Sequence, residues 1–363
     1  MSVIASAIGP ARAPAKINLA LHVVGQRDDG YHLLESLIVF TRFGDRVTVG
    51  RAEADQFVVT GPYGSAVPTD GSNLVLRARD ALRPALPRGA GFPVSISLEK
   101  NLPPASGMGG GSSDAAATLK GLAGLWGTHR VLLEKIGLSL GADVPMCLSP
   151  LPALVSGIGE KVGRLPSFPP LFIVLVNPGV EVSTPAVFSR LKTKNNAGLG
   201  WPVSGDRSVI ASKDTPTPGL SPQGTGELCV GAAQRQNSTV LAEGSETASP
   251  STPFAPSSGG DGGGGNGPLK SREALYAWLG KTRNDLQAPA LELAPVIGTT
   301  LEALRATQAR FVRMSGSGAT CFGLYDTKEG AEAAAAEIRR VQPRWFVVAT
   351  ETFAASGEDN GGN

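Results

Sequence analysis

The stretch LPPASGMGGGSSD, residues 102–114, is the most informative part of this sequence. A strand-like apolar run precedes it, and the helix-forming segment AAATLKGLAGLW follows it. Glycine is costly inside a helix or strand because it loses more backbone entropy on folding than any other residue. So many glycines at a helix entrance indicate that another group approaches the backbone closely there, and a phosphate group fits that description.

Two familiar phosphate loops do not fit this stretch. A Walker A loop needs a lysine after its last glycine, and a dinucleotide fingerprint needs a third glycine where Ser112 stands. What fits is a loop whose successive backbone N–H groups face the phosphates, with the hydroxyls of Ser112 and Ser113 near the metal or phosphate oxygens. The alternative is a flexible linker like GGDGGGG at residues 259–265, but that run has no flanking strand or helix.

The composition indicates a protein with room for two domains. The chain has 363 residues, of which 41% are hydrophobic, enough to fill sizeable cores. A formal net charge of +2 gives no bulk attraction to nucleic acid or to a membrane surface, so neither is expected as a partner. Arg12, Lys16 and Asn18 interrupt the apolar residues near the N-terminus, so neither a signal peptide nor a membrane span is predicted.

The cysteines and histidines indicate a reducing compartment and no zinc. Cys147, Cys229 and Cys321 are odd in number and far apart, which fits free thiols better than a disulfide framework. With three histidines and no Cys-x-x-Cys pair, a zinc site is not expected. The sequence therefore predicts a cytoplasmic protein.

Apolar periodicity and turn signals predict an α+β chain. In the first part, strands are predicted at residues 15–24, 31–40, 46–49, 57–60 and 94–98, with helices at 73–86 and from the glycines to about 126. In the second part, strands are predicted at 171–176, 309–314, 321–325 and 345–350, with helices at 272–279, 296–306 and 328–341. Strand, helix and strand in this order indicate a small α+β second domain.

The character of the sequence changes between about residue 192 and residue 270. Pro, Gly, Ser and Thr dominate, apolar periodicity is lost, and the segment ends in SSGGDGGGGNG. Such a composition cannot bury enough apolar surface to fold compactly. The segment is therefore predicted to be a disordered insertion that contributes almost nothing to the core or to a site.

Three motifs occur in order along the chain: PAKINL at residues 14–19, LPPASGMGGGSSDAA at 102–116 and SGSGAT at 315–320. They resemble the signature motifs of the GHMP kinase superfamily of galactose, homoserine, mevalonate and phosphomevalonate kinases. The resemblance implies a ribosomal-protein-S5-like N-terminal domain, residues 1–165, and a ferredoxin-like C-terminal domain, residues 166–355, with the active site in the cleft between them. It also implies ATP binding by the second motif, through Pro103, Pro104, Ala105, Ser106, Gly107, Met108, Gly109, Gly110, Gly111, Ser112 and Ser113.

Three longer segments add detail: APAKINLALHVVGQRDDGYH at residues 13–32, LGADVP at 140–145 and NPGVEVSTPAVF at 177–188. Together they resemble the branch of the superfamily that phosphorylates 4-diphosphocytidyl-2-C-methyl-D-erythritol. The resemblance implies that ATP, with Mg²⁺, phosphorylates the 2-hydroxyl of this cytidine diphosphate compound on the methylerythritol phosphate route to isoprenoid precursors. The alternatives are another small-molecule enzyme of the superfamily, such as mevalonate kinase or diphosphomevalonate decarboxylase, and a catalytically inactive binding protein on the same scaffold.

Asp143 and Lys16 match the positions of a catalytic pair in the superfamily. The resemblance implies that Asp143 orients the acceptor hydroxyl and takes its proton, while Lys16 keeps that carboxylate ionised and stabilises the charge on the transferring group. From the residues alone, Asp143 is equally an ordinary helix N-cap before a proline. From the residues alone, Lys16 is likewise interpreted as a solvated residue on an otherwise apolar strand.

The resemblance also implies a pocket for the cytosine ring and for the substrate's hydroxyls. Tyr31 and Phe188 are expected to sandwich the base while His32 reads its hydrogen-bonding edge, as unpaired nucleobases are commonly read. Asn18 follows the catalytic lysine by two residues, on the same strand face, and is placed to bind the hydroxyls. Thr184 is expected near the same pocket. In a second interpretation, Tyr31 and His32 simply close a hairpin.

The turn at residues 315–320 also has two interpretations. Its glycines would let the backbone of the second domain approach the phosphate loop and support it, as in the superfamily. A simple β-turn predicts nearly the same sequence.

Overall fold

The computed structural model describes residues 7–165, 167–200 and 271–355. The described part combines helices with two separate sheets, which confirms the predicted α+β class. Most of the predicted insertion, residues 201–270, lies outside the described residues, as do both ends of the chain.

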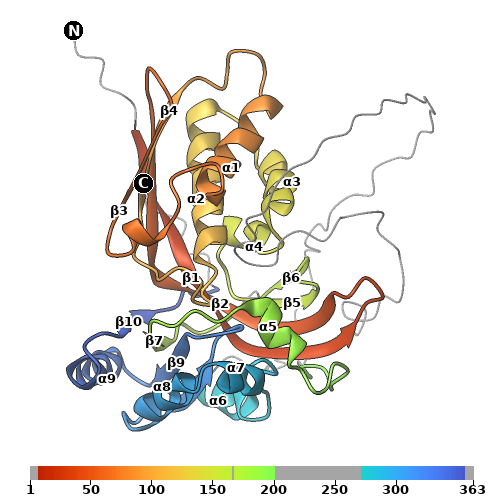
Figure 1. The fold of residues 1–363 in the computed structure, drawn as a ribbon, viewed down its shortest axis with the longest axis vertical. Helices are drawn as coiled ribbons and strands as arrows, with labels where there is room; N and C mark the ends of the chain where they lie inside the picture. Colours follow the sequence, from red (N-terminus) through yellow and green to blue (C-terminus); the bar gives the residue numbers. More distant parts are fainter. Residues whose placement is uncertain (1–6, 166, 201–270, 356–363) are drawn as a thin grey trace, which may run out of the picture.

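The first sheet has the strand order β3-β4-β2-β5-β6, with β1 paired to β2. Its strands are β1 (Ala7–Gln26), β2 (His32–Arg51), β3 (Gln56–Thr60), β4 (Val94–Glu99), β5 (Ala153–Gly157) and β6 (Lys161–Arg164). β1 and β2 are 20 residues long and pair antiparallel as one hairpin, whose red and orange strands curve through the middle of Figure 1. This hairpin extends from the layer of helices above it to the second sheet.

β2 unites two segments that the sequence predicts as separate strands, residues 31–40 and 46–49. Gly44 explains the continuity, because a Cβ atom there would lie 2.2 Å from the carbonyl oxygen of Ala13. Only glycine lets β2 pass so close to β1, and the pairing register shifts at this point, between Pro14 and Lys16. The expected break is therefore a bulge within one strand.

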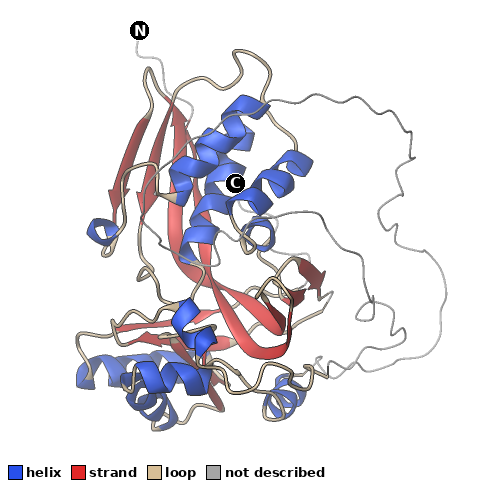
Figure 2. Ribbon diagram, turned by 45° about the vertical axis from the view of Figure 1, so that its right-hand side comes forward, coloured by secondary structure: helices blue, strands red, loops and turns tan. Residues whose placement is uncertain are grey.

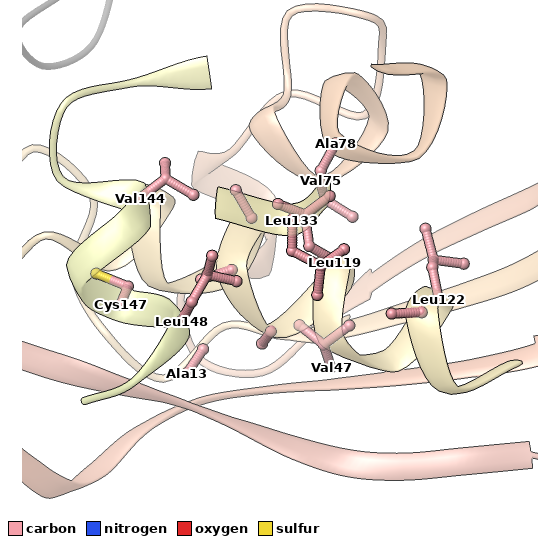
Figure 3. Packing of buried hydrophobic residues seen from close by; sticks show 14 of the residues in the cluster. Ala13, Val47, Val75, Ala78, Leu119, Leu122, Leu133, Val144, Cys147 and Leu148 are labelled. Atoms are coloured by element: carbon pink, nitrogen blue, oxygen red, sulfur yellow. The ribbon is translucent and has the colours of Figure 1, made fainter. Parts of the chain in front are cut away.

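Four helices cover one face of the first sheet (Figures 1 and 2). They are α1 (Leu74–Leu82), α2 (Gly110–Trp126), α3 (Arg130–Leu140) and α4 (Val144–Leu148). Figure 3 shows Leu119 of α2 between Val47 of β2 and Val75 of α1, so the predicted long helix fills the core between sheet and helices. α1 ends earlier than predicted because Pro84 lies in the 3₁₀ turn that follows it.

The second sheet has the strand order β10-β7-β9-β8. Its strands are β7 (Phe172–Asn177), β8 (Phe311–Met314), β9 (Cys321–Tyr325) and β10 (Phe346–Glu351). The helices of this half, seen in the lower part of Figure 1, are α5 (Thr184–Ser189), α6 (Arg272–Leu279), α7 (Gln287–Leu293), α8 (Val296–Arg305) and α9 (Lys328–Val341). The first sheet ends at β6 and the second begins at β7, while the domain boundary at residue 165 stays a prediction.

β7 shows how the two sheets come together. Val174 and Val176 pack into a cluster with α8 and α9, whereas Ile173 and Leu175 pack into a second cluster with β1 and β2. Successive strand residues point to opposite faces, so the second sheet lies between α8 and α9 on one side and the long hairpin on the other. The predicted buried strand at residues 171–176 is confirmed. This packing brings the first motif, on β1, next to the turn after β8.

In the parts of the chain that the structure describes, no helix is long and apolar enough to cross a membrane. The two described cysteines, Cys147 and Cys321, are buried free thiols.

Candidate active site

The glycine-rich loop connects β4 to α2, and its backbone has a positive φ at Ala105, Gly107 and Gly109 (49°, 76° and 64°). Its glycines meet different neighbours. A Cβ on Gly107 would lie 2.7 Å from the carbonyl oxygen of Gly318, and a Cβ on Gly109 would lie 3.3 Å from the Cβ of Lys16. Close approach to these glycines is therefore confirmed, and the approaching groups in the described structure belong to the protein itself.

The turn at residues 315–320 contacts this loop directly. The hydroxyl of Ser315 donates to the carbonyl oxygen of Gly107 (3.4 Å), and the N–H of Thr320 donates to that of Ser106 (3.3 Å). The amide of Asn284 holds the turn by donating to two backbone carbonyls around it, at 2.8 Å each. The expected support of the loop by the turn is confirmed.

Lys16 of β1 and Asp143, the residue before α4, form an ion pair in which Lys16 Nζ donates to Asp143 Oδ2 across 127 residues of sequence. The side chain of Lys16 is 10% exposed and that of Asp143 is 37% exposed. Asp143 does occupy the N-cap position of α4, with Pro145 in the first turn, but its side chain makes no capping bond. Lys16 is buried, so the interpretation that it is solvated is wrong. The N–H of Lys16 donates to the carbonyl oxygen of Met108 (2.8 Å), which fixes the pair beside the loop.

α2 begins without a side-chain cap and without an acidic residue in its first turn. Its first described intrahelical bond runs from the N–H of Ser113 to the carbonyl oxygen of Gly109 (3.0 Å). The N–H groups of Gly110, Gly111 and Ser112 therefore precede the hydrogen-bonded ladder. Such groups, at the positive end of the helix dipole, form a ready anion-binding site.

Ser113 differs from its expected role. It is 1% exposed, and its hydroxyl donates to the carbonyl oxygen of Pro14 (2.7 Å) and lies 3.5 Å from the thiol of Cys147. It therefore holds β1 against α2 instead of facing a phosphate, because Ser113, the fourth residue of α2, points to the buried side of the helix. Burial raises the pKa of Cys147 to about 12, so its thiol stays neutral beside the ion pair.

Asn18 lies at the junction of the two sheets. Its N–H donates to the hydroxyl of Ser315 (3.0 Å), and its side-chain amide donates to the hydroxyl of Ser36 (2.7 Å). Its Oδ1 lies 3.4 Å from where a Cβ of Gly316 would be. The structure thus places Asn18 between the hairpin and the turn at 315–320, one pleat along β1 from Lys16.

His32 and Phe188 stack on each other, with ring centroids 4.7 Å apart and planes inclined at 25°. Burial, and then the charge of Lys194, lower the pKa of His32, so its ring is neutral at physiological pH. Its Nε2 is buried without a hydrogen-bond partner among the described residues. The N–H of Tyr31 donates to Asp29 within the hairpin turn (3.3 Å), which fits the interpretation that Tyr31 closes the hairpin.

Thr184 begins α5, the helix that also carries Phe188. Its hydroxyl shares a 2.7 Å hydrogen bond with the hydroxyl of Ser317 in the turn at residues 315–320. α5 therefore connects the stacked rings to the turn that supports the loop.

The predicted insertion begins too early at residue 192. The N–H of Asn196 donates to the carbonyl oxygen of Val23 in β1 (3.1 Å), Leu199 is 6% exposed in a core cluster, and His22 contacts the carbonyl oxygen of Ala197 (3.1 Å). Residues 192–200 thus pack along the hairpin. A polar composition hid this, because only Leu199 enters the core, while Asn196 and Ala197 bind through backbone and amide groups.

Sequence reasoning missed two further features. The first is Asn284, which holds the turn at residues 315–320. It lies in the run TRND, residues 282–285, after α6, and nothing in that run indicates a contact with a distant turn. A buried cluster of Lys100, Asp45 and Asp114 lies beneath the start of α2. The sequence did offer a signal for this cluster, because the charged residues Lys100 and Asp114 stand before and after the glycine-rich stretch.

A metal-binding cluster is not evident. Within residues 7–165, 167–200 and 271–355, no group of three or more His, Cys, Asp and Glu side chains is arranged to hold a metal ion.

The comparisons with known proteins agree with this geometry. The family model for the GHMP kinases N terminal domain matches residues 73–150, and that for the GHMP kinases C terminal domain matches residues 271–344. The 4-diphosphocytidyl-2-C-methyl-D-erythritol kinase of Mesorhizobium japonicum is 46% identical over 348 residues, 95% of this chain and 96% of that protein. The protein of the same name from Chelativorans sp. is 44% identical and covers 95% and 97%.

Solved structures show the same relationship. A crystal structure of 4-(cytidine 5'-diphospho)-2C-methyl-D-erythritol kinase matches 96% of this chain and 100% of its own, with a TM-score of 0.65 and 28% identity. The phosphomevalonate kinase of Streptococcus pneumoniae has a TM-score of 0.56 at 11% identity, over 97% and 100% of the two chains, and shares the fold. This chain belongs to the 4-diphosphocytidyl-2-C-methyl-D-erythritol kinases, a family of the GHMP kinases.

Proposed function

We propose that this chain transfers the γ-phosphoryl group of ATP to the 2-hydroxyl of 4-diphosphocytidyl-2-C-methyl-D-erythritol, as the names of its relatives indicate. The observation that carries the proposal is the ion pair of Lys16 and Asp143 beside the glycine-rich loop. Phosphoryl transfer depends mostly on positioning and on neutralising charge, and this pair offers both a proton acceptor and a cation at one place.

Asp143 is the proposed general base. Its Oδ2 is bonded to Lys16, which leaves Oδ1 to accept the proton of the acceptor hydroxyl. The acceptor oxygen then bonds to the γ-phosphorus as the bond to the bridging oxygen breaks, and ADP leaves. Lys16 holds the carboxylate in place and faces the negative charge that develops on the transferring group.

The phosphates of ATP are proposed to bind at the loop and the start of α2. Residues 103–112 surround the uncapped N–H groups there, whereas Ser113 is occupied within the protein. Mg²⁺ would be carried by the phosphate oxygens of ATP, because the described residues form no cluster for a resident ion. The ion would neutralise phosphate charge.

The cytosine ring is proposed to bind at His32 and Phe188. At 4.7 Å the two rings already cover each other, so a base either separates them or stacks on the outer face of Phe188. The unpartnered Nε2 of His32 supplies a polar partner for the base edge. Asn18 and Thr184 are proposed to contact the rest of the substrate, and Tyr31 to flank the base from the hairpin.

We further propose that residues 1–165 and 166–355 are the two domains, and that the enzyme acts in the cytoplasm, where ATP is supplied. The sheets divide the chain between β6 and β7, in keeping with such a boundary. The buried free thiols of Cys147 and Cys321 fit a reducing compartment.

The test is ADP release with magnesium-ATP and one acceptor at a time. The acceptors are 4-diphosphocytidyl-2-C-methyl-D-erythritol, mevalonate, diphosphomevalonate, homoserine and galactose. We expect rapid, saturable release with the cytidylyl compound, and the product should carry phosphate on the 2-hydroxyl by NMR. Faster release with another acceptor would contradict the proposed substrate, and no release with any of them would favour a binding protein.

A further inference from the structure

Lys100 and two carboxylates form a sealed cluster under the glycine-rich loop. Lys100 Nζ donates to Asp45 Oδ2 (2.8 Å) and to Asp114 Oδ2 (2.7 Å). The side chains of Lys100, Asp45 and Asp114 are only 4%, 0% and 5% exposed. Water and substrates therefore do not reach these charges, and the cluster has no place in the chemical step.

The cluster joins both ends of the loop. Lys100 is the residue that follows β4, and Asp114 lies in the second turn of α2, 14 residues later. The other oxygen of Asp45 accepts the N–H groups of Asn101 (2.5 Å) and Leu102 (2.8 Å), the first two residues of the loop. β2, the loop entrance and α2 are thus tied at one point.

The cluster also touches the place where α2 begins. A Cβ on Gly110 would lie 3.0 Å from Lys100 Nζ and 3.5 Å from Asp45 Oδ2. The ammonium group therefore lies directly beneath the first residue of α2, a helix whose start has no side-chain cap. The position of this helix start depends on contacts from below it.

Stability alone does not account for such a cluster. Burying a lysine and two carboxyl groups away from water is expensive, and apolar replacements of buried ion clusters are often neutral or stabilising. Here Asp114 Oδ1 is, in addition, buried without a hydrogen-bond partner among the described residues. What a sealed, multiply bonded cluster supplies is a fixed separation between the elements that it joins.

We propose that Lys100, Asp45 and Asp114 are positioning residues: they hold the two ends of the glycine-rich loop at a fixed separation and so aim the first N–H groups of α2 at the phosphates of ATP. The proposal rests on the proposed ATP-dependent function. Its measurable consequence is nucleotide affinity, because a helix start displaced by a fraction of an ångström no longer matches the phosphate oxygens.

Nucleotide binding to the full-length protein tests the proposal. The variant Lys100→Met alone buries two unpaired carboxylates and is expected to unfold readily, so the informative protein is Lys100→Met/Asp114→Leu. It removes Lys100 together with one of its two carboxyl partners and leaves Asp45 with its two backbone donors. We expect it to melt cooperatively, with Kd for a non-hydrolysable ATP analogue, measured by calorimetry, raised by about tenfold or more. The KM for ATP should rise in parallel, and that for the cytidylyl substrate should not.

Two control variants separate positioning from general softening of α2. Asp114→Asn keeps an oxygen that accepts from Lys100 and should bind nucleotide nearly as well as the wild type. Thr118→Val lies one turn further along α2, where the fully buried hydroxyl donates to the carbonyl oxygen of Asp114 (2.8 Å). It disturbs the same helix outside the cluster and should leave the Kd unchanged.

The outcomes distinguish this proposal from the proposed function. Wild-type affinity in a well-folded double variant overturns the positioning role, and so does an equal loss of affinity in Thr118→Val. A loss of nucleotide affinity that is confined to the double variant supports the positioning role. The double variant alone can show weakened nucleotide binding while the wild-type protein does not phosphorylate the cytidylyl compound. In that case the substrate assignment fails and the positioning role stands.

Discussion

Two lysines contact neighbouring glycines of the same loop and are held in opposite ways. Lys16 touches Gly109 and has one carboxylate partner, which is 37% exposed. Lys100 lies under Gly110 and has two carboxylate partners, which are 0% and 5% exposed. A partly open ion pair can meet a substrate and exchange a proton, whereas a sealed cluster can only hold its neighbours in place. Exposure of the partner carboxylate separates a chemical role from a positional one.

The largest expected effect is at the open pair. Asp143→Asn removes the proton acceptor but keeps the size of the side chain, so kcat should fall by about 10²–10⁴-fold. Nucleotide Kd and melting temperature should change little, because the side chain of Asp143 makes no capping bond to α4. Steady-state kinetics with calorimetry measure both. Lys16→Met should likewise lower turnover more than binding. Near-normal turnover in a folded Asp143→Asn protein would show that the open pair is not catalytic.

Gly110→Val addresses the sealed cluster. Valine adds methyl groups where a Cβ already lies 3.0 Å from Lys100 Nζ, so it pushes the cluster and the helix start apart. We expect stability to fall by about 1–3 kcal/mol, as for other overpacked cores, together with a clear loss of ATP affinity. Gly71, whose Cβ would meet nothing within 4 Å, offers a matched site where valine should change neither quantity. Unchanged affinity in Gly110→Val would separate the cluster from nucleotide binding.

The pH dependence of stability is a finer test of the sealed cluster. Burial raises the pKa of Asp114 to about 8; Lys100 opposes this and Asp45 adds to it. The folded protein then keeps a proton that the unfolded chain, with a carboxyl pKa near 3.9, loses. The stabilisation is therefore present at low pH and is lost as the pH rises toward about 8. Burial lowers the pKa of Lys100, but the two carboxylates outweigh it, so Lys100 stays charged throughout.

Asp114→Asn supplies the reference protein for that measurement. The melting temperature of the wild type minus that of Asp114→Asn should decrease between about pH 5 and pH 8, since only the carboxyl group titrates. Calorimetric scans in a pH series provide the data. A difference that is constant with pH would mean that the proton is not held in the folded state.

The smallest expected effect concerns the predicted insertion. Residues 192–200 pack on β1, the strand that carries Lys16, whereas residues 201–270 are predicted from their composition to be dispensable. A short Gly-Ser linker in place of 201–270 should stabilise the protein by about 1 kcal/mol, because loop-closure entropy grows slowly with length. Kinetic constants should not change.

A linker that starts at residue 192 is the matched comparison. It removes Asn196 and Leu199 from the hairpin and should lower the melting temperature. A raised KM for the cytidylyl substrate with the 201–270 replacement would contradict the prediction and show that this segment covers the substrate.

Much of the fold was predictable because apolar periodicity is local. The strands at β4, β7, β9 and β10 and the helices α2, α6 and α9 follow directly from it. α4, β5 and β6 were not predicted, since they are short elements ordered by the layer they pack on. The longer helix α3 was also missed, although Leu133 and Ile136 on its buried face are spaced as in an amphipathic helix. The continuity of β2 was missed because Gly44 signals a turn in the sequence, and only its contact with Ala13 makes it part of a strand.

The site was predictable to the extent that its motifs are contiguous. The loop, Lys16 and Asp143 were named from the sequence, and the structure brings them together. Ser113 was assigned to the phosphates with Ser112 because both hydroxyls lie at the helix start in the second motif, but the Ser113 hydroxyl donates to Pro14 in the structure. Asn284 carried no local mark of its contact with the turn.

The sequence by itself determined that residues 102–113 form a glycine-rich loop and the start of a helix, because glycine content and the apolar run of α2 are local properties. Only the tertiary structure decided what fills the space that the glycines leave. Asp143 lies 127 residues from Lys16, and Asp45 lies 55 residues from Lys100. Their meeting depends on strand pairing and on the bulge near Gly44. Register and burial are properties of the packed sheet, so of two lysines that look alike in the sequence, Lys16 has one partly exposed partner and Lys100 has two sealed ones.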